Sequence, residues 1–195
     1  MNSMIDNKHT NDEREPGIEP KKFVLWLMLV SSTMLFAAFT SAVIVRRGDG
    51  NWTVFELPQM FLYSSIIIAI SSLFMQWALS SAKKNKITEL KISLSITFIL
   101  GVIFILAQIE GWSQMVEQSV HFSFANPSGS FVYVITGVHL AHIVVGLGYL
   151  LVIFIKTLQH KIHKENLRGI AMCRTFWHFI GIVWIYLYVF LFLNR

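Results

Sequence analysis

The chain contains five apolar runs, each long enough to cross a lipid bilayer and each bounded by charged or turn residues. A hydrocarbon core about 30 Å thick needs roughly 20 mostly apolar residues per helix, and a helix satisfies its own backbone hydrogen bonds inside lipid. Of all positions, 54% are hydrophobic and only 14% are charged, which is too apolar for an ordinary soluble domain. We therefore predict an all-α polytopic membrane protein whose five transmembrane helices span approximately residues 23–45, 60–82, 87–109, 130–155 and 172–193.

The basic residues predict how these helices are oriented. The N-terminal segment and the second and fourth links together hold thirteen Lys and Arg, against three in the alternate segments. Because cytoplasmic loops carry the excess of Lys and Arg, we expect the N-terminus inside and the C-terminus outside. The polar residues 1–22 then form a flexible cytoplasmic tail, and residues 23–195 form the transmembrane domain. Since topology accounts for the basic residues, the net charge of +5 does not indicate nucleic-acid binding.

Two histidines, His139 and His142, stand in the otherwise apolar segment GVHLAHIVVGLG of the fourth run. Residues three apart share a face of a helix, so one haem cannot take both as axial ligands from opposite sides of its ring. A metal ion would need a third and a fourth ligand, and the chain has no CxxCH motif for covalent haem. We expect imidazoles that hydrogen-bond a neighbouring helix, a backbone carbonyl or a lipid headgroup, and we predict no catalytic, cofactor-binding or metal-binding residue.

Three further residues are structural or lipid-contact candidates. Trp177 and His178, in the segment FWHFIG, are predicted to anchor the fifth helix near the inner interface. Helix rise places His178 within about 5 Å of the depth of His142, so the two can touch if the fourth and fifth helices are neighbours. Glu110 ends the third run near the outer surface, where a carboxylate at a membrane boundary is ordinary; a proton or cation site is the alternative.

Three segments carry a resemblance to a known family. TGVHLAHIVVGLGYL, TFWHFIGIVWIYLYVFLF and LWLMLVSSTMLFAAF resemble, in spacing and order, subunit III of haem–copper terminal oxidases, and the similarity extends over residues 23–195. The chain looks like the short form of that family, which has five helices.

This resemblance implies an accessory subunit without cofactors of its own in the respiratory chain, with haem and copper in partner subunits. Such a subunit packs mainly on oxidase subunit I, meets subunit II and other subunits of the complex, binds lipid, and supports proton uptake and the integrity of the oxygen-reducing centre. The implied location is the bacterial plasma (inner) membrane. The family's recurrent polar and aromatic positions, which are structural or lipid-facing, match Glu110, His139, His142, Trp177 and His178.

The chain departs from the family pattern at two acidic positions, which are Ser32 and Gly181 here. Loss of both acids argues against proton handling within the membrane by this subunit itself. Alternatives within the family are subunit III of a quinol oxidase and a homologue associated with nitric oxide reductase. From other classes, a stand-alone membrane cytochrome or a transporter would use His142 and His178 directly. No helix shows paired Gly/Pro breaks around a charged midplane site, which argues against the transporter.

Overall fold

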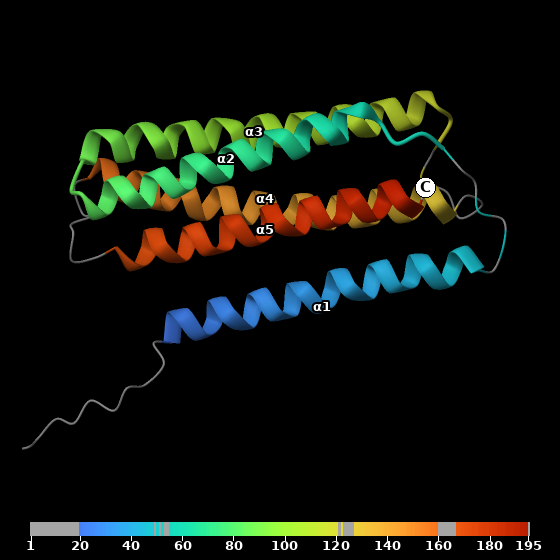
Figure 1. Ribbon diagram of the computed structural model, residues 1–195, viewed down its shortest axis with the longest axis horizontal. Helices are drawn as coiled ribbons and strands as arrows, with labels where there is room; N and C mark the ends of the chain where they lie inside the picture. The colour runs from blue at the N-terminus through green and yellow to red at the C-terminus, as the bar shows by residue number, and fades with distance from the viewer. Residues whose placement is uncertain are drawn as a thin grey trace, which may run out of the picture.

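The computed structural model describes residues 20–48, 50, 52, 55–120, 122, 127–159 and 167–194. Within them lie five α-helices, each long and apolar enough to cross a membrane, and the predicted all-α architecture is confirmed (Figure 1). Their bounds are α1 Pro20–Gly48, α2 Gln59–Lys83, α3 Ile87–Glu117, α4 Pro127–Leu158 and α5 Arg168–Asn194. Residues 1–19 of the predicted tail lie outside the described residues.

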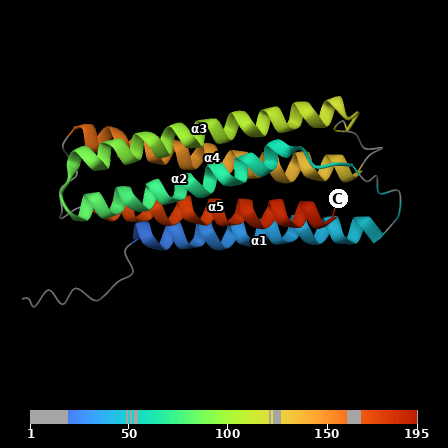
Figure 2. The same ribbon diagram turned by 45° about the horizontal axis from the view of Figure 1, so that its top comes forward.

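Helices α2 to α5 form a four-helix bundle, and α1 lies against one side of it. In the bundle α2 packs on α3 and α5, and α4 packs on the same two helices, while α1 contacts α4 and α5 (Figures 1 and 2). Successive helices run in opposite directions, so α1 begins at one end of the molecule and α5 finishes at the other. The two ends of the chain's helical part therefore face opposite sides of a membrane.

The sequence of α1 shows why it adds only one narrow face to the bundle. Its buried residues recur every three or four positions: Leu29, Ser32, Phe36, Thr40 and Val43. This spacing places them on one stripe of a helix, and the stripe faces the groove between α4 and α5. The rest of α1 is exposed and apolar, as a surface against lipid or a partner subunit would be.

Helix α3 extends beyond its predicted end at residue 109. The prediction placed the end at the sequence EGW, but Gly111 lies inside the helix, where a Cβ atom would come within 2.6 Å of the ring of Phe61. Gly111 therefore permits α2 and α3 to approach closely instead of ending α3. The helix ends two turns later at Glu117, and Ser119, with a φ of 60°, closes a Schellman motif in which the Val120 N–H donates to the Met115 carbonyl over 2.9 Å.

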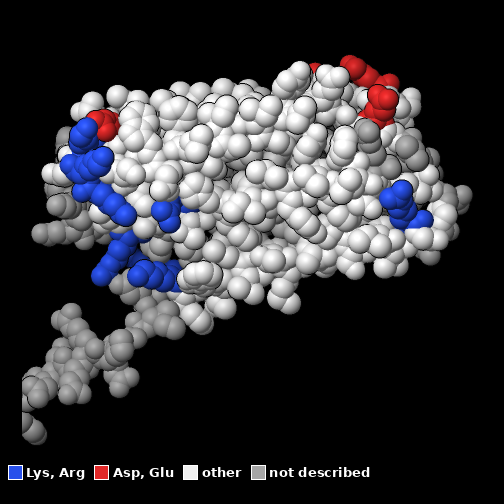
Figure 3. Space-filling model, in the orientation of Figure 1, with Lys and Arg blue, Asp and Glu red and all other residues white. Residues whose placement is uncertain are grey.

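A second Schellman motif makes the sharp turn between α2 and α3. Asn85 adopts a φ of 57°, and the N–H of Lys86 donates to the carbonyl of Ser81 over 3.0 Å. Most Lys and Arg side chains visible in Figure 3 gather at this end of the bundle, and most of the acidic ones gather at the opposite end. This asymmetry is the one from which the inside position of the N-terminus is predicted.

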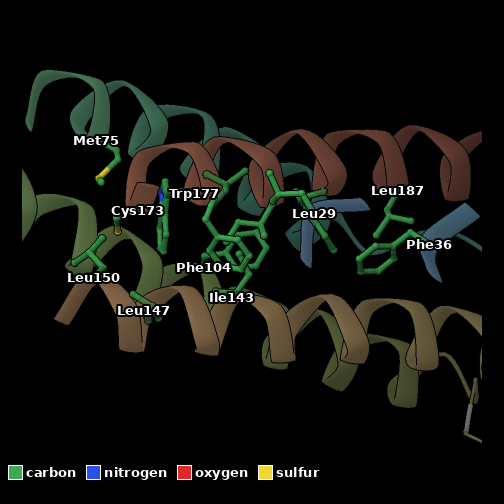
Figure 4. Packing of buried hydrophobic residues seen from close by; sticks show 14 of the residues in the cluster. Leu29, Phe36, Met75, Phe104, Ile143, Leu147, Leu150, Cys173, Trp177 and Leu187 are labelled. Atoms are coloured by element: carbon green, nitrogen blue, oxygen red, sulfur yellow. The ribbon is translucent and has the colours of Figure 1, made fainter. Parts of the chain in front are cut away.

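The core is filled by aromatic and branched side chains from all five helices. Figure 4 shows some of them, among them Phe104 of α3, Ile143 of α4 and Trp177 of α5, projecting into the space between the helices. Gly101 makes room for the ring of Trp177, because a Cβ atom there would lie 2.9 Å from the Trp177 Cη2 atom. Close helix contacts at glycine are the association signal expected of helices in lipid.

Candidate functional site

His142 joins α4 to α1 through a hydrogen bond whose direction the geometry defines. Its Nδ1 atom lies 2.8 Å from the carbonyl oxygen of Val138, one turn earlier in α4. A carbonyl only accepts, so Nδ1 carries the proton; in the neutral ring Nε2 is then the acceptor. The Ser32 hydroxyl of α1, 3.2 Å from Nε2, is its donor. Of the partners expected from the sequence, this histidine uses two, a neighbouring helix and a backbone carbonyl.

His139 lies one turn away on α4 and is fully buried, with 0% of its surface exposed. It packs among aromatic rings of three other helices, at centroid distances of 6.0 Å to Phe36, 6.1 Å to Phe104 and 5.1 Å to Trp184. Neither ring nitrogen hydrogen-bonds a described residue. His139 is thus held by packing, and the hydrogen bond that the sequence led us to expect for it is not made to the described part of the chain.

Trp177 is not at a lipid interface. The sequence predicts an interfacial anchor, but the side chain is 0% exposed, and its Nε1–H donates to the Ser71 hydroxyl of α2 over 3.0 Å. Trp184 lies on the same buried face of α5, and its Nε1–H donates to the Ser65 hydroxyl of α2 over 3.0 Å. These indole rings therefore pair α5 with α2, because an indole N–H buried in an apolar bundle needs an acceptor.

Sequence reasoning missed a further set of interhelical polar pairs. Gln108 of α3 donates to the Ser64 hydroxyl over 2.7 Å, and both side chains are fully buried. Trp112 of α3 donates to Thr136 of α4 over 3.0 Å. The available signal was the frequency of Ser and Thr inside the apolar runs, since small hydroxyl residues are typical of interfaces between membrane helices.

His178 lies on a different side of α5 from these rings. It is half-buried and lines a cavity of about 220 Å³ together with Ser72 of α2 and Gly181. The structure does not bring it to His142, which faces α1. A joint site of His142 and His178, as a membrane cytochrome or transporter would use, is therefore not formed.

Glu110 is exposed on α3, two turns before the end of the helix. It hydrogen-bonds no described residue, so nothing in the described part of the chain builds a site around it. In the same ranges, no group of three or more His, Cys, Asp or Glu side chains is placed to hold a metal ion. The single cysteine, Cys173, is buried.

Several polar side chains of the interior thus hydrogen-bond a neighbouring helix, and large apolar side chains are exposed on the outer surface of all five helices. These features define a multi-pass α-helical membrane subunit. The family model described as cytochrome c oxidase subunit III matches residues 3–194, which is nearly the whole chain. The chain belongs to this family, and it is an accessory subunit of a haem–copper oxidase in a bacterial membrane.

The chain aligns with individual relatives over almost the full length of both proteins. The chain is 29% identical to the cytochrome bo(3) ubiquinol oxidase subunit 3 of Pseudomonas aeruginosa, over 95% of this chain and 94% of the relative. It is 25% identical to the cytochrome c oxidase subunit 3 of Bacillus sp. (strain PS3), over 93% and 90%. It is 24% identical to a probable quinol oxidase subunit 3 of Staphylococcus saprophyticus, over 95% and 94%.

Proposed function

We propose that this chain packs against the haem-bearing subunit I of its oxidase, with subunit II and other subunits nearby, and contributes no redox centre of its own. The observation that supports this most is the surroundings of the two histidines of α4. His142 has both ring nitrogens engaged in helix contacts, and His139 is enclosed by aromatic rings. An imidazole ligand to haem needs a free nitrogen aimed at an open axial position, and neither ring offers one.

We propose in addition that lipid occupies a groove at the N-terminal end of α1. There α1 stands apart from α4 and α5, and the apolar groove between them has a volume of about 550 Å³. Its walls include Met28 of α1, Val145 of α4 and Phe176 of α5, and Lys21 lies at one end. Apolar walls suit an acyl chain, and a lysine near the membrane surface suits a lipid phosphate. Bound lipid would support the stability of the complex, and through it proton uptake by the oxygen-reducing centre.

Co-purification tests the oxidase assignment. An affinity tag on this chain should recover a large polytopic subunit whose visible spectrum shows haem, together with copper, from mildly solubilised membranes. The chain expressed alone should show no haem absorption. A stoichiometric b-type spectrum of the isolated chain that disappears in His142→Ala would instead identify a membrane cytochrome. Recovery of a nitric oxide reductase subunit would identify the homologue associated with that enzyme, and activity with quinol or cytochrome c would identify the electron donor.

Lipid analysis of the purified complex tests the groove. Met28→Trp places a bulky ring in the groove and should reduce the lipid retained per complex. The matched control is Leu106→Trp, at a side chain of α3 that is 60% exposed and remote from α1. Lys21→Gln should lower the anionic fraction of the retained lipid. Equal lipid content in Met28→Trp and wild type would contradict the proposal.

A further inference from the structure

A line of polar side chains on the outward side of α2 and α5 has hydrogen-bonding groups that find no partner in the described part of the chain. Arg174 of α5 donates from one terminal nitrogen to the side-chain oxygen of Gln76 over 3.3 Å. Its Nε atom is buried and has no partner, and no described carboxylate forms an ion pair with its guanidinium. A cationic group in a membrane helix normally pairs with an acid or with backbone carbonyls. The Nε–H of Arg174 is therefore a buried donor without an acceptor in the described part of the chain.

One turn further along α5, the same side of the bundle holds a cavity with polar walls. The ring of His178 and the hydroxyl of Ser72 line it, and neither hydrogen-bonds a described residue. The cavity exists where α5 has Gly181, because a Cβ atom there would lie 3.3 Å from the Ser72 hydroxyl oxygen. Its volume of about 220 Å³ is enough for one side chain that enters from outside.

Donors in the interior of the bundle differ from those of this strip in having acceptors within the chain. Inside, Trp177, Trp184 and Gln108 each donate to a serine hydroxyl on the facing helix. These three donors each find an acceptor on another helix of this chain. A partner outside the chain is the simplest source of the acceptors that Arg174 and His178 lack, since unpaired polar groups are costly in lipid.

The depth of the strip selects a protein partner over a lipid headgroup. Helix α5 has 27 residues and is about 40 Å long, so about 5 Å extends beyond each face of a 30 Å hydrocarbon core. Arg174 then lies about 4 Å inside the core and His178 about 10 Å inside it. A lipid phosphate can meet the long arginine side chain, but only a side chain on a transmembrane helix reaches the level of His178 and Ser72.

We propose that the strip formed by Ser72, Gln76, Arg174 and His178 is the docking surface for a transmembrane helix of the haem-bearing subunit. That helix supplies one carboxylate side chain, which accepts hydrogen bonds from Arg174 and His178 and occupies the cavity beside Gly181. A carboxylate fits this place because it only accepts when ionised, and all its neighbours in the strip can donate. The inference rests on the proposed function and names the face through which it is carried out.

Photo-crosslinking in the assembled oxidase tests the position of the surface. A benzophenone amino acid at Ile182, which is 67% exposed beside the cavity, should crosslink to the haem-bearing subunit. The same probe at Leu106, an exposed residue of α3 that does not line the cavity, should not. Crosslinks from Leu106 but not from Ile182 would overturn the docking surface and leave the proposed function standing. Failure of every variant to recover a haem-bearing subunit would overturn the proposed function itself.

Matched substitutions test the chemistry. Arg174→Gln should increase the fraction of this subunit lost in a detergent wash of the complex by roughly 10-fold, since one charged hydrogen bond is removed. Lys156 is an exposed cation of α4 at the same end of the bundle. Lys156→Gln should change the fraction lost by less than 2-fold, because exposed charges contribute little. Gly181→Leu should fill the cavity and release the subunit. Gly148→Leu, at a lipid-facing glycine with no atom within 4 Å, should not.

A charge exchange separates docking from folding and from lipid binding. Arg174→Glu should release the subunit. Replacing the carboxylate residue of the crosslinked partner helix by Lys should then restore retention of the Arg174→Glu variant. Unaltered amounts of each variant in membranes that lack the partner would show that folding is intact. Normal retention of Arg174→Gln accompanied by loss of bound anionic lipid would assign the strip to lipid and overturn the proposal.

Discussion

The hydrogen bond between Ser32 and His142 allows a quantitative test of how α1 is held. Ser32→Ala removes the hydroxyl that donates to Nε2, and His142→Ala removes the acceptor together with a ring that packs 5.4 Å from the centroid of Phe36. Side-chain hydrogen bonds between membrane helices contribute about 0.6 kcal/mol on average and up to about 1.7 kcal/mol. We expect a coupling energy in this range, because Ser32 is buried and its Oγ lies 3.2 Å from Nε2.

A double-mutant cycle measures this coupling without the packing contribution of the ring. The free energy of unfolding of wild type, both single variants and the double variant is obtained by denaturant titration in mixed micelles. Thr33→Ala is the control, because the Thr33 hydroxyl donates to the Leu29 carbonyl within α1 and crosses to no other helix. We expect it to change stability by no more than about 0.5 kcal/mol. Additive effects of Ser32→Ala and His142→Ala would refute the assignment of this pair as a bond that holds α1.

Four further outcomes are expected. His139→Phe should leave thermal stability unchanged or raise it slightly, because it removes two unpartnered ring nitrogens and keeps an aromatic ring in the pocket; a loss above about 2 kcal/mol would point to a bound partner there. Gly111→Ala should destabilise the fold by about 1–3 kcal/mol through its clash with a phenylalanine ring of α2, whereas Gly148→Ala should be neutral or stabilising in the same unfolding assay. His142→Ala and His178→Ala should spare the initial turnover rate of the oxidase and shorten its active lifetime; immediate loss of oxygen reduction would contradict a non-catalytic role. Reporter fusions should place the N-terminus in the cytoplasm and the C-terminus outside, and the reverse pattern would contradict the charge argument.

Hydropathy alone was sufficient to predict the number and class of the helices. The length of an apolar run is set by the thickness of the bilayer, so it can be read without any knowledge of packing. The end of α3 was predicted too early because the apolar run ends before Glu110, whereas the helix continues to Glu117 with Gly111 in close contact with α2. Glycine has both uses in membrane helices, and only the neighbouring helix distinguishes them.

The inward face of each helix was much harder to predict. In a soluble protein the apolar stripe marks the core, but here lipid and core are both apolar, so apolarity does not say which way a side chain points. Trp177 illustrates the difficulty, because its place near the end of an apolar run is that of an interfacial anchor, yet it is fully buried. The sequence predicted that His142 bonds a neighbouring helix, but only the packing of α1 against α4 identifies Ser32 as its partner.

The contacts of α1 show how the proposed lipid groove and the proposed docking strip are separated in the fold. Side chains of α1 that bond to the bundle include Ser32 to His142, Thr40 to Tyr186 over 3.0 Å and Arg47 to Asn194 over 3.2 Å. All three lie in the part of α1 that follows Leu29, the first buried residue of the helix. The part before Leu29 forms a wall of the apolar groove. Leu25 and Met28 pack this end of α1 against the core, whereas the α2–α5 strip lies on the four-helix bundle. The groove and the cavity of the strip share no lining residue, so a lipid in the groove would not occupy the proposed contact with the catalytic subunit.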